Sequence, residues 1–172
     1  MEQRPRVTLI LSKLDKFLER AALLLLLFLW GFTFFAFFNL PQTIPIHFNS
    51  SGDADRHGSK MTLLILPFIA GILYVCITQL NKHPHIFNYA TKITEANAAQ
   101  QYTAATRMLR YIKFAVIIIF SAIVYATYQI GMGEADVLGP WFFPVLITVS
   151  MVGSAVSIWQ FARKPKNDQR RS

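Results

Sequence analysis

Charged residues are scarce in this chain of 172 residues, and four long stretches contain no Asp, Glu, Lys, Arg or His. Only 15% of the residues are charged, whereas 53% are hydrophobic and 14% are aromatic. Such a composition excludes an ordinary soluble domain. The uncharged stretches, at about 21–39, 61–80, 114–131 and 137–162, are each close to the roughly 20 residues that a helix needs to cross a bilayer. We therefore predict an all-α membrane protein, a bundle of four transmembrane helices.

Cysteine is almost absent, because Cys76 is the only one in the chain. An intrachain disulfide is therefore excluded, and a lone thiol in an apolar stretch is most often a small hydrophobic residue. The lack of Asp, Glu and His in the four stretches argues against intramembrane proteolysis and against proton-coupled transport. Ser50, Ser51 and Ser59 lie near histidines in the sequence, but no nucleophile motif surrounds them. We predict that the protein is not an enzyme and has no cofactor.

The Lys and Arg residues are distributed unevenly among the segments outside these stretches. The N-terminal segment, the segment between the second and third stretches, and the C-terminal segment hold five each, whereas the loop 40–60 holds two and the third loop none. Positive charge accumulates on cytoplasmic segments of membrane proteins. Both termini are therefore predicted to be cytoplasmic, and the loop 40–60 faces outward. We therefore attribute the net charge of +8 to segments that lie beside the lipid bilayer, and we predict no nucleic-acid partner.

The two ends of the chain are predicted to lie outside the transmembrane domain 21–162. Residues 1–20 form an arm in which apolar residues recur at helical spacing: Val7, Ile10, Leu11, Leu14, Phe17 and Leu18. This pattern favours an amphipathic helix along the inner membrane surface. A helix that continues directly into the first span is the other interpretation. The basic segment 163–172 is predicted to be a disordered tail.

The loop from Leu40 to Lys60 concentrates the residues that a membrane span does not need. It contains two Pro, two Gly, two His and two Asp in 21 residues, which is longer than a simple connection requires. Ile44, Ile46 and Phe48 alternate with other residues as in an extended segment, and a turn-forming run follows. We expect a small hairpin or an irregular cap over the helix ends. The leading functional hypothesis is that this outward loop recognises a peptide, a lipid or a partner protein.

Metal binding by this loop is the third hypothesis, together with enzymatic activity. Imidazole and carboxylate groups suit zinc or a harder divalent ion, and the loop has such groups at His47, Asp53, Asp55 and His57. Their spacing matches no recognised metal motif, so no metal site is predicted. We expect His47 to hold the loop by a hydrogen bond. The histidines would also titrate near neutral pH.

The loop also carries a pattern that resembles a known family. The pattern reads Leu-Pro-x-x-Ile-Pro-x-His-Phe over 40–48, followed by Gly, Asp-Arg and Gly-Ser-Lys over 52–60, and its defining residues are Pro45, His47, Phe48, Gly52, Asp55, Arg56, Gly58 and Lys60. It is similar to the small bacterial membrane domain of unknown function found at the N-terminal end of the Sdp-type toxin immunity proteins. The resemblance covers about 23–128. It implies a bacterial inner-membrane protein, with toxin immunity or envelope signalling as roles.

An alternative functional surface lies in the predicted cytoplasmic segment 89–113. Thr94 is a suitable N-cap for a helix that begins near Glu95, and nothing breaks that helix before Gln129. The third span therefore extends several turns into the cytoplasm. Tyr89, Arg107 and Arg110 would there dock a cytoplasmic regulator on a membrane scaffold. The sequence does not define an oligomeric state.

The predicted topology can be tested by labelling single cysteines in a Cys76→Ser background. We expect an impermeant thiol reagent to modify Ser51→Cys in intact cells and Ser172→Cys only after lysis, because the charge distribution places these positions on opposite sides of the membrane. The reverse pattern would place the loop 40–60 in the cytoplasm and contradict an outward ligand.

Overall fold

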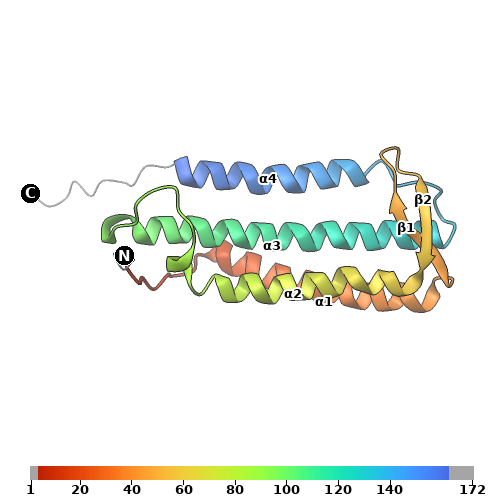
Figure 1. Ribbon diagram of the computed structural model, residues 1–172, viewed down its shortest axis with the longest axis horizontal. Coiled ribbons are helices and arrows are strands. Elements are labelled where there is room, and N and C mark those ends of the chain that lie inside the picture. Colours follow the sequence, from red (N-terminus) through yellow and green to blue (C-terminus); the bar gives the residue numbers. More distant parts are fainter. Residues whose placement is uncertain (1–3, 163–172) are drawn as a thin grey trace, which may run out of the picture.

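The computed structural model describes residues 4–162, with the side chains of the last helix described to Met151 and at Ala155. The chain is mostly helical (Figure 1). The helices are α1 (Lys13–Asn39), α2 (Ile65–Leu80), α3 (Glu95–Gly131) and α4 (Phe142–Ala162). A hairpin of β1 (Thr43–Phe48) and β2 (Ala54–Ser59) connects α1 to α2, and two short 3-10 helices, η1 (Lys60–Leu64) and η2 (Pro84–Ile86), flank α2.

Three helical segments are long and apolar enough to cross a membrane. They are Lys13–Asn39, Lys60–Leu80 and Glu95–Gly131. The helix α4 is 21 residues long, but its side chains are described only to Met151 and at Ala155, so the fourth span remains a prediction. The predicted disordered tail at 163–172 lies outside the described residues. The structure thus supports a membrane protein with three candidate spans.

The helices are arranged in layers around α3. Figure 1 shows α3 in the middle, α1 and α2 together on one side of it, and α4 on the other. The predicted bundle of four transmembrane helices remains a prediction, of which the mostly helical chain and its three candidate spans are shown. Small residues allow α1, α2 and α3 to approach closely, since Ala22, Ala36 and Ala70 are fully buried there together with larger residues such as Leu29 and Val124.

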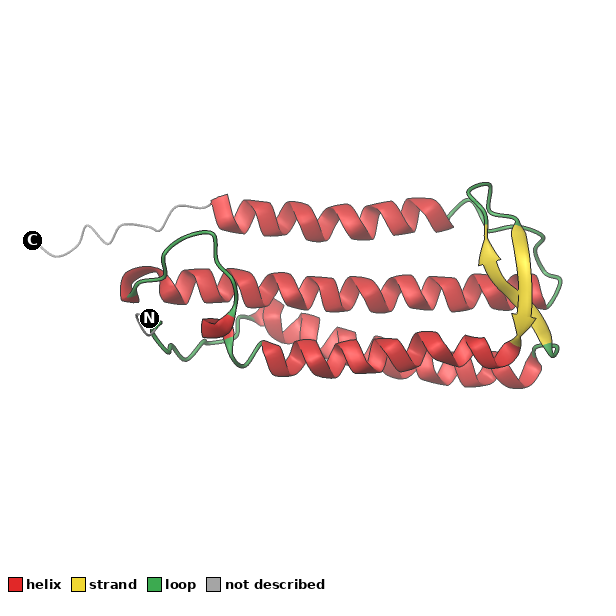
Figure 2. Cartoon of the chain, in the orientation of Figure 1, coloured by secondary structure: helices red, strands yellow, loops and turns green. Residues whose placement is uncertain are grey.

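The hairpin and the N-terminal segment lie at opposite ends of the helices. Figure 2 shows the two strands across one end, and the irregular segments around the N-terminus and η2 gather at the other end. The basic residues of the described chain concentrate at this second end, which the charge rule predicts to be cytoplasmic. We call it the basic end. Any ligand of the hairpin and any partner of the basic end would therefore meet different sides of the membrane.

The prediction of a separate amphipathic helix in the N-terminal arm is wrong. Residues 4–11 are not helical, and α1 begins at Lys13 and continues directly into the apolar stretch. Ser12 starts this helix through a capping box: its hydroxyl accepts from the Asp15 amide at 3.2 Å, and the Asp15 carboxylate accepts from the Ser12 amide at 3.0 Å. The apolar residues Val7 and Leu9 pack against a cluster around Tyr102 instead of a membrane surface.

The predicted start and length of the third helix are confirmed. Thr94 is the N-cap of α3, and its amide donates to Asn97 Oδ1 at 2.9 Å. The helix is 37 residues long and continuous to Gly131. Pro67 lies in the first turn of α2, shortly after η1, where a missing amide donor costs little.

Buried ion pairs connect α1 to α3 at the basic end. The Asp15 carboxylate, of which only 2% is exposed, accepts from Arg107 Nε at 2.7 Å and from Arg107 Nη2 at 2.9 Å. One turn further along α1, the Glu19 carboxylate accepts from Arg110 Nε at 3.0 Å and from Lys113 Nζ. We call these five residues the ion network. Asp15, Arg110 and Lys113 are almost fully buried, so the charge of each depends on its partner, whereas Glu19 and Arg107 remain partly exposed.

Lys113 of α3 extends the ion network from α1 to α2. Its ammonium group also donates to Thr78 Oγ1 of α2 at 2.9 Å and lies 4.4 Å from the centre of the Tyr74 ring. Only 1% of the Lys113 side chain is exposed. A single buried cation thus contacts α1 and α2 from α3, which fixes the relative positions of all three helices.

We expect Asp15→Asn to destabilise the protein by about 3–5 kcal/mol, because it leaves Arg107 without its buried counter-charge while keeping the capping oxygen. Unfolding by denaturing detergent in mixed micelles would measure the loss. Lys16→Gln is the matched control, because Lys16 is exposed on the same turn of α1. Equal stabilities of the two variants would contradict a structural role of the network.

Candidate functional site

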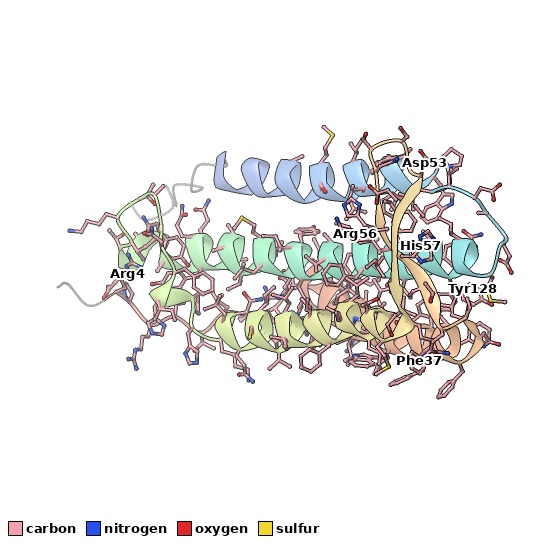
Figure 3. The ribbon with its side chains drawn as sticks, turned by 45° about the vertical axis from the view of Figure 1, so that its right-hand side comes forward. Arg4, Phe37, Asp53, Arg56, His57 and Tyr128 are labelled. Atoms are coloured by element: carbon pink, nitrogen blue, oxygen red, sulfur yellow. The ribbon has the colours of Figure 1, made fainter. Side chains whose placement is uncertain are left out.

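The hairpin forms the candidate site, and its strands pair with an irregular register. The strands are antiparallel, with Pro45 opposite His57 and His47 opposite Arg56, and the register shifts on either side of His47. Proline has no amide hydrogen for the ladder, which fits its position beside such an irregularity. The two histidines and Arg56 are therefore brought into one short stretch of sheet. Arg56 and His57 are exposed on β2 (Figure 3).

The turn of the hairpin is organised by Asn49. Its side-chain oxygen accepts from the amides of Ser51 and Asp53, each at 2.9 Å, and its backbone amide donates to the Asp53 carbonyl at 3.0 Å. Asn is favoured in turns for this mode of bonding. The turn closes at Gly52, where φ is +90°, a conformation that glycine alone adopts without strain.

Gly52 also attaches the hairpin to the connection between α3 and α4. Its carbonyl accepts from the Leu138 amide at 2.9 Å, and Asp53 forms an isolated antiparallel bridge with Val137. A Cβ at position 52 would lie 3.2 Å from the Leu138 Cβ. The fixed glycine of the loop pattern thus has two structural requirements, a left-handed backbone and close approach to another segment. Leu138 could not be predicted as a partner of this glycine from the sequence.

His47 and Asp55 form a hydrogen-bonded pair across the hairpin. The distance between His47 Nδ1 and Asp55 Oδ1 is 2.6 Å, and their side chains are 57% and 43% exposed. Exposed pairs of this kind contribute about 0–1 kcal/mol, so this pair orients the two side chains more than it stabilises the fold. Asp53 instead accepts from Asn49. Within residues 4–162, no group of three His, Cys, Asp or Glu side chains could hold a metal ion.

Lys60 and Gly58 have structural positions at the base of the hairpin. The Lys60 ammonium group donates to the carbonyls of Phe37 and Leu40, at 2.9 and 3.1 Å, and lies 4.9 Å from the centre of the Phe37 ring. A cation at the end of α1 satisfies carbonyls that have no partner within the helix and interacts favourably with the helix dipole. A Cβ on Gly58 would lie 2.8 Å from the Ile46 side chain. Lys60 therefore fixes the hairpin to α1, and Gly58 allows the two strands to lie close together.

An apolar pocket of about 330 Å³ lies between the hairpin and the helices. We call it the hairpin pocket. Its lining comes from β1, η1, α2 and α3, and includes Pro45, Phe48, Thr62, Leu66, Ile123 and Thr127. Two pattern residues, Pro45 and Phe48, thus line a cavity, while His57 and Arg56 lie across the sheet from this strand. The volume falls at the lower limit of the range of about 300–1,000 Å³ for small-molecule sites.

The three residues of the alternative surface have mainly intramolecular contacts. Arg107 and Arg110 face α1 in the ion network, and their side chains are 20% and 6% exposed; docking of a regulator through them stays a prediction. The Tyr89 hydroxyl donates to the Pro84 carbonyl at 2.8 Å. Burial raises the pKa of Tyr89 to about 12, so the hydroxyl keeps its proton as a donor. Cys76, expected to be buried, is exposed on α2.

The comparisons with known proteins identify a domain but no activity. The family described as "Domain of unknown function (DUF1648)" matches residues 24–71, which include the end of α1, the hairpin and the start of α2. An uncharacterized protein of Archaeoglobus fulgidus is 35% identical over 86 residues, which cover 45% of this chain and 47% of that protein. The chain thus spans about half the length of this curated relative. No solved structure matches the chain.

We expect Gly52→Ala to weaken the attachment of the hairpin by about 1–3 kcal/mol, because the new Cβ meets Leu138 and the left-handed backbone disfavours alanine. Hydrogen exchange of the Leu138 amide, the donor to Gly52, would report the change directly. Gly133→Ala is the matched control: its φ is +75°, but a Cβ there meets nothing within 4 Å. Unchanged exchange at Leu138 in the Gly52 variant would contradict this account.

Proposed function

We propose that the protein is a non-enzymatic membrane protein whose hairpin recognises a ligand at the outer surface of a bacterial inner membrane. In this proposal the chain spans the membrane four times, with both termini in the cytoplasm. The ligand is a peptide, a lipid or a partner protein. The observation that carries the proposal is the combination of exposed polar groups on the hairpin with the apolar hairpin pocket beside them.

This combination supports recognition more than catalysis. Ligand sites are typically apolar cavities with a few polar groups that fix orientation, and the hairpin offers Arg56 and His57 near such a cavity. Catalysis would need a nucleophile or a base held by a third group within hydrogen-bond reach. The His47–Asp55 pair lacks a described third partner. Structural residues such as Gly52 and Lys60 hold the hairpin in place, which leaves the exposed side chains available for contact.

The physiological role that we propose follows from the resemblance of the loop to the Sdp-type toxin immunity domain. In that role the hairpin binds a peptide toxin, or a signal in the envelope, before it reaches the bilayer. The match of residues 24–71 to a domain of unknown function centres on the same loop. Toxin sensitivity therefore provides a defined phenotype for the first assay.

We expect Arg56→Ala with His57→Ala to abolish complementation of a strain that lacks the gene, because the double variant removes two exposed polar side chains of the hairpin without breaking a described side-chain hydrogen bond. Survival under a peptide toxin of the Sdp type, together with the other phenotypes of the deletion, would be scored. Lys82→Ala, an exposed cation at the basic end, is the control. Full complementation by the double variant at normal abundance would contradict recognition through the hairpin.

A further inference from the structure

A second apolar cavity lies at the basic end, beside α3. It is a groove of about 670 Å³ between the end of α2, the segment around η2 and one face of α3. We call it the α3 groove. Its apolar lining includes Leu80, Ile86, Tyr89, Ala105, Met108 and Leu109. Ile86 is 62% exposed, although it lies outside every candidate span. Large exposed apolar residues outside the bilayer indicate an interaction site.

The α3 groove extends beyond the membrane. Uncharged sequence on α3 begins at Phe114, and the groove reaches back to Gln101. At a rise of 1.5 Å per residue, these thirteen residues place its far end about 20 Å from the apolar stretch. The headgroup region on each side of a bilayer is only about 5–8 Å thick. The groove is therefore accessible from water, and a membrane lipid could not fill its length while remaining in the bilayer.

The surroundings of the groove are strongly basic. Residues 4–20 and 81–113, which form this end of the molecule, contain ten Lys and Arg against three Asp and Glu. The ion network pairs two of these acids, Asp15 and Glu19, with Arg107, Arg110 and Lys113, so seven Lys and Arg and one acid lie outside it. Lys82 and Lys92 are exposed, and each lies within two residues of a groove residue. An occupant with negative charge is therefore favoured electrostatically.

The basic charge of this end disfavours two other occupants of the groove, a second copy of this chain and its segment 163–172. A second copy of this chain would bring an equally basic end to the interface, and the segment 163–172 carries five basic residues and one acid. Like charges at an interface are costly.

The face of α3 that lines the groove extends from Gln101 to Leu109, which is about 12 Å or two helical turns. This length suits the apolar face of a helix, which presents side chains at positions i, i+3, i+4 and i+7.

We propose that the α3 groove binds an acidic amphipathic helix of a partner protein on the cytoplasmic side. Leucine-like side chains of the partner fill the groove between Ile86 and Met108, and its acidic residues face the lysines at the rim. The docking function is thus retained for the segment 89–113, but its residues are the apolar ones and not Arg107 and Arg110. This inference is independent of a ligand at the hairpin, because the two surfaces lie at opposite ends of the molecule.

The probe is a fluorescent synthetic helix with leucines on one face and glutamates on the other, and its partner probe has lysines in place of the glutamates. Anisotropy would measure binding to the full chain in phosphatidylcholine nanodiscs. We expect the acidic helix to bind and the basic helix not to bind. Ile86→Asp should weaken binding at least about tenfold, which is 1.4 kcal/mol. Ile10→Asp, which adds the same charge at a residue 93% exposed outside the groove, should change it less than about twofold.

Several results would overturn the inference. Equal binding of both peptides, no binding of the acidic helix, or equal effects of the two Asp variants would each contradict recognition in the groove. A dimer of the unmodified protein that Ile86→Asp dissociates would assign the groove to a second copy. Phospholipid that is retained through purification and lost in Ile86→Asp would assign it to lipid. None of these results depends on whether Arg56 and His57 are needed for complementation.

Discussion

The arrangement of the helices depends on five charged side chains where α1 meets α3, three of them almost fully buried and two partly exposed. A buried charge is costly unless it is paired and hydrogen-bonded. Asp15 and Glu19 on α1 satisfy Arg107, Arg110 and Lys113 on α3, and Lys113 also contacts α2. Apolar packing alone would allow the three helices to slide along one another, since lipid and side chains are similarly apolar. The ion network removes that freedom.

The hairpin, at the opposite end of the helices, is held among the described residues by hydrogen bonds to backbone carbonyls and not by ion pairs. The hairpin is attached by the Lys60 ammonium group on the carbonyls at the end of α1 and by the Leu138 amide on the Gly52 carbonyl. Both attachments use backbone groups, so they constrain the position of the strands while the outer side chains remain free to differ. Ligand-contacting residues on a rigidly held loop are a common arrangement for recognition. The proposed ligand surface and the proposed docking groove thus lie on one rigid helical frame.

Much of this fold could be predicted from the sequence, because its signals are local. Uncharged stretches define the candidate spans, and Thr94 begins α3 where its capping chemistry predicts. The pairing of Asp15 with Arg107 could not be predicted, since 92 positions separate them and charge alone does not specify a partner. Likewise, helical spacing from Val7 to Leu18 suggested a membrane-bound helix, but residues 7–11 are not helical, and Val7 packs against the cluster around Tyr102 of α3. The loop pattern marked Gly52 and Lys60, and only the three-dimensional contacts show that both are structural.

The separation of the paired charges along the chain has a consequence for biosynthesis. The carboxylates of α1 are made about ninety residues before the cations of α3, so they have no partner while α1 and α2 enter the bilayer. The two acids therefore gain their ionic partners only when α3 has been made, and a chain interrupted before α3 lacks the ion network.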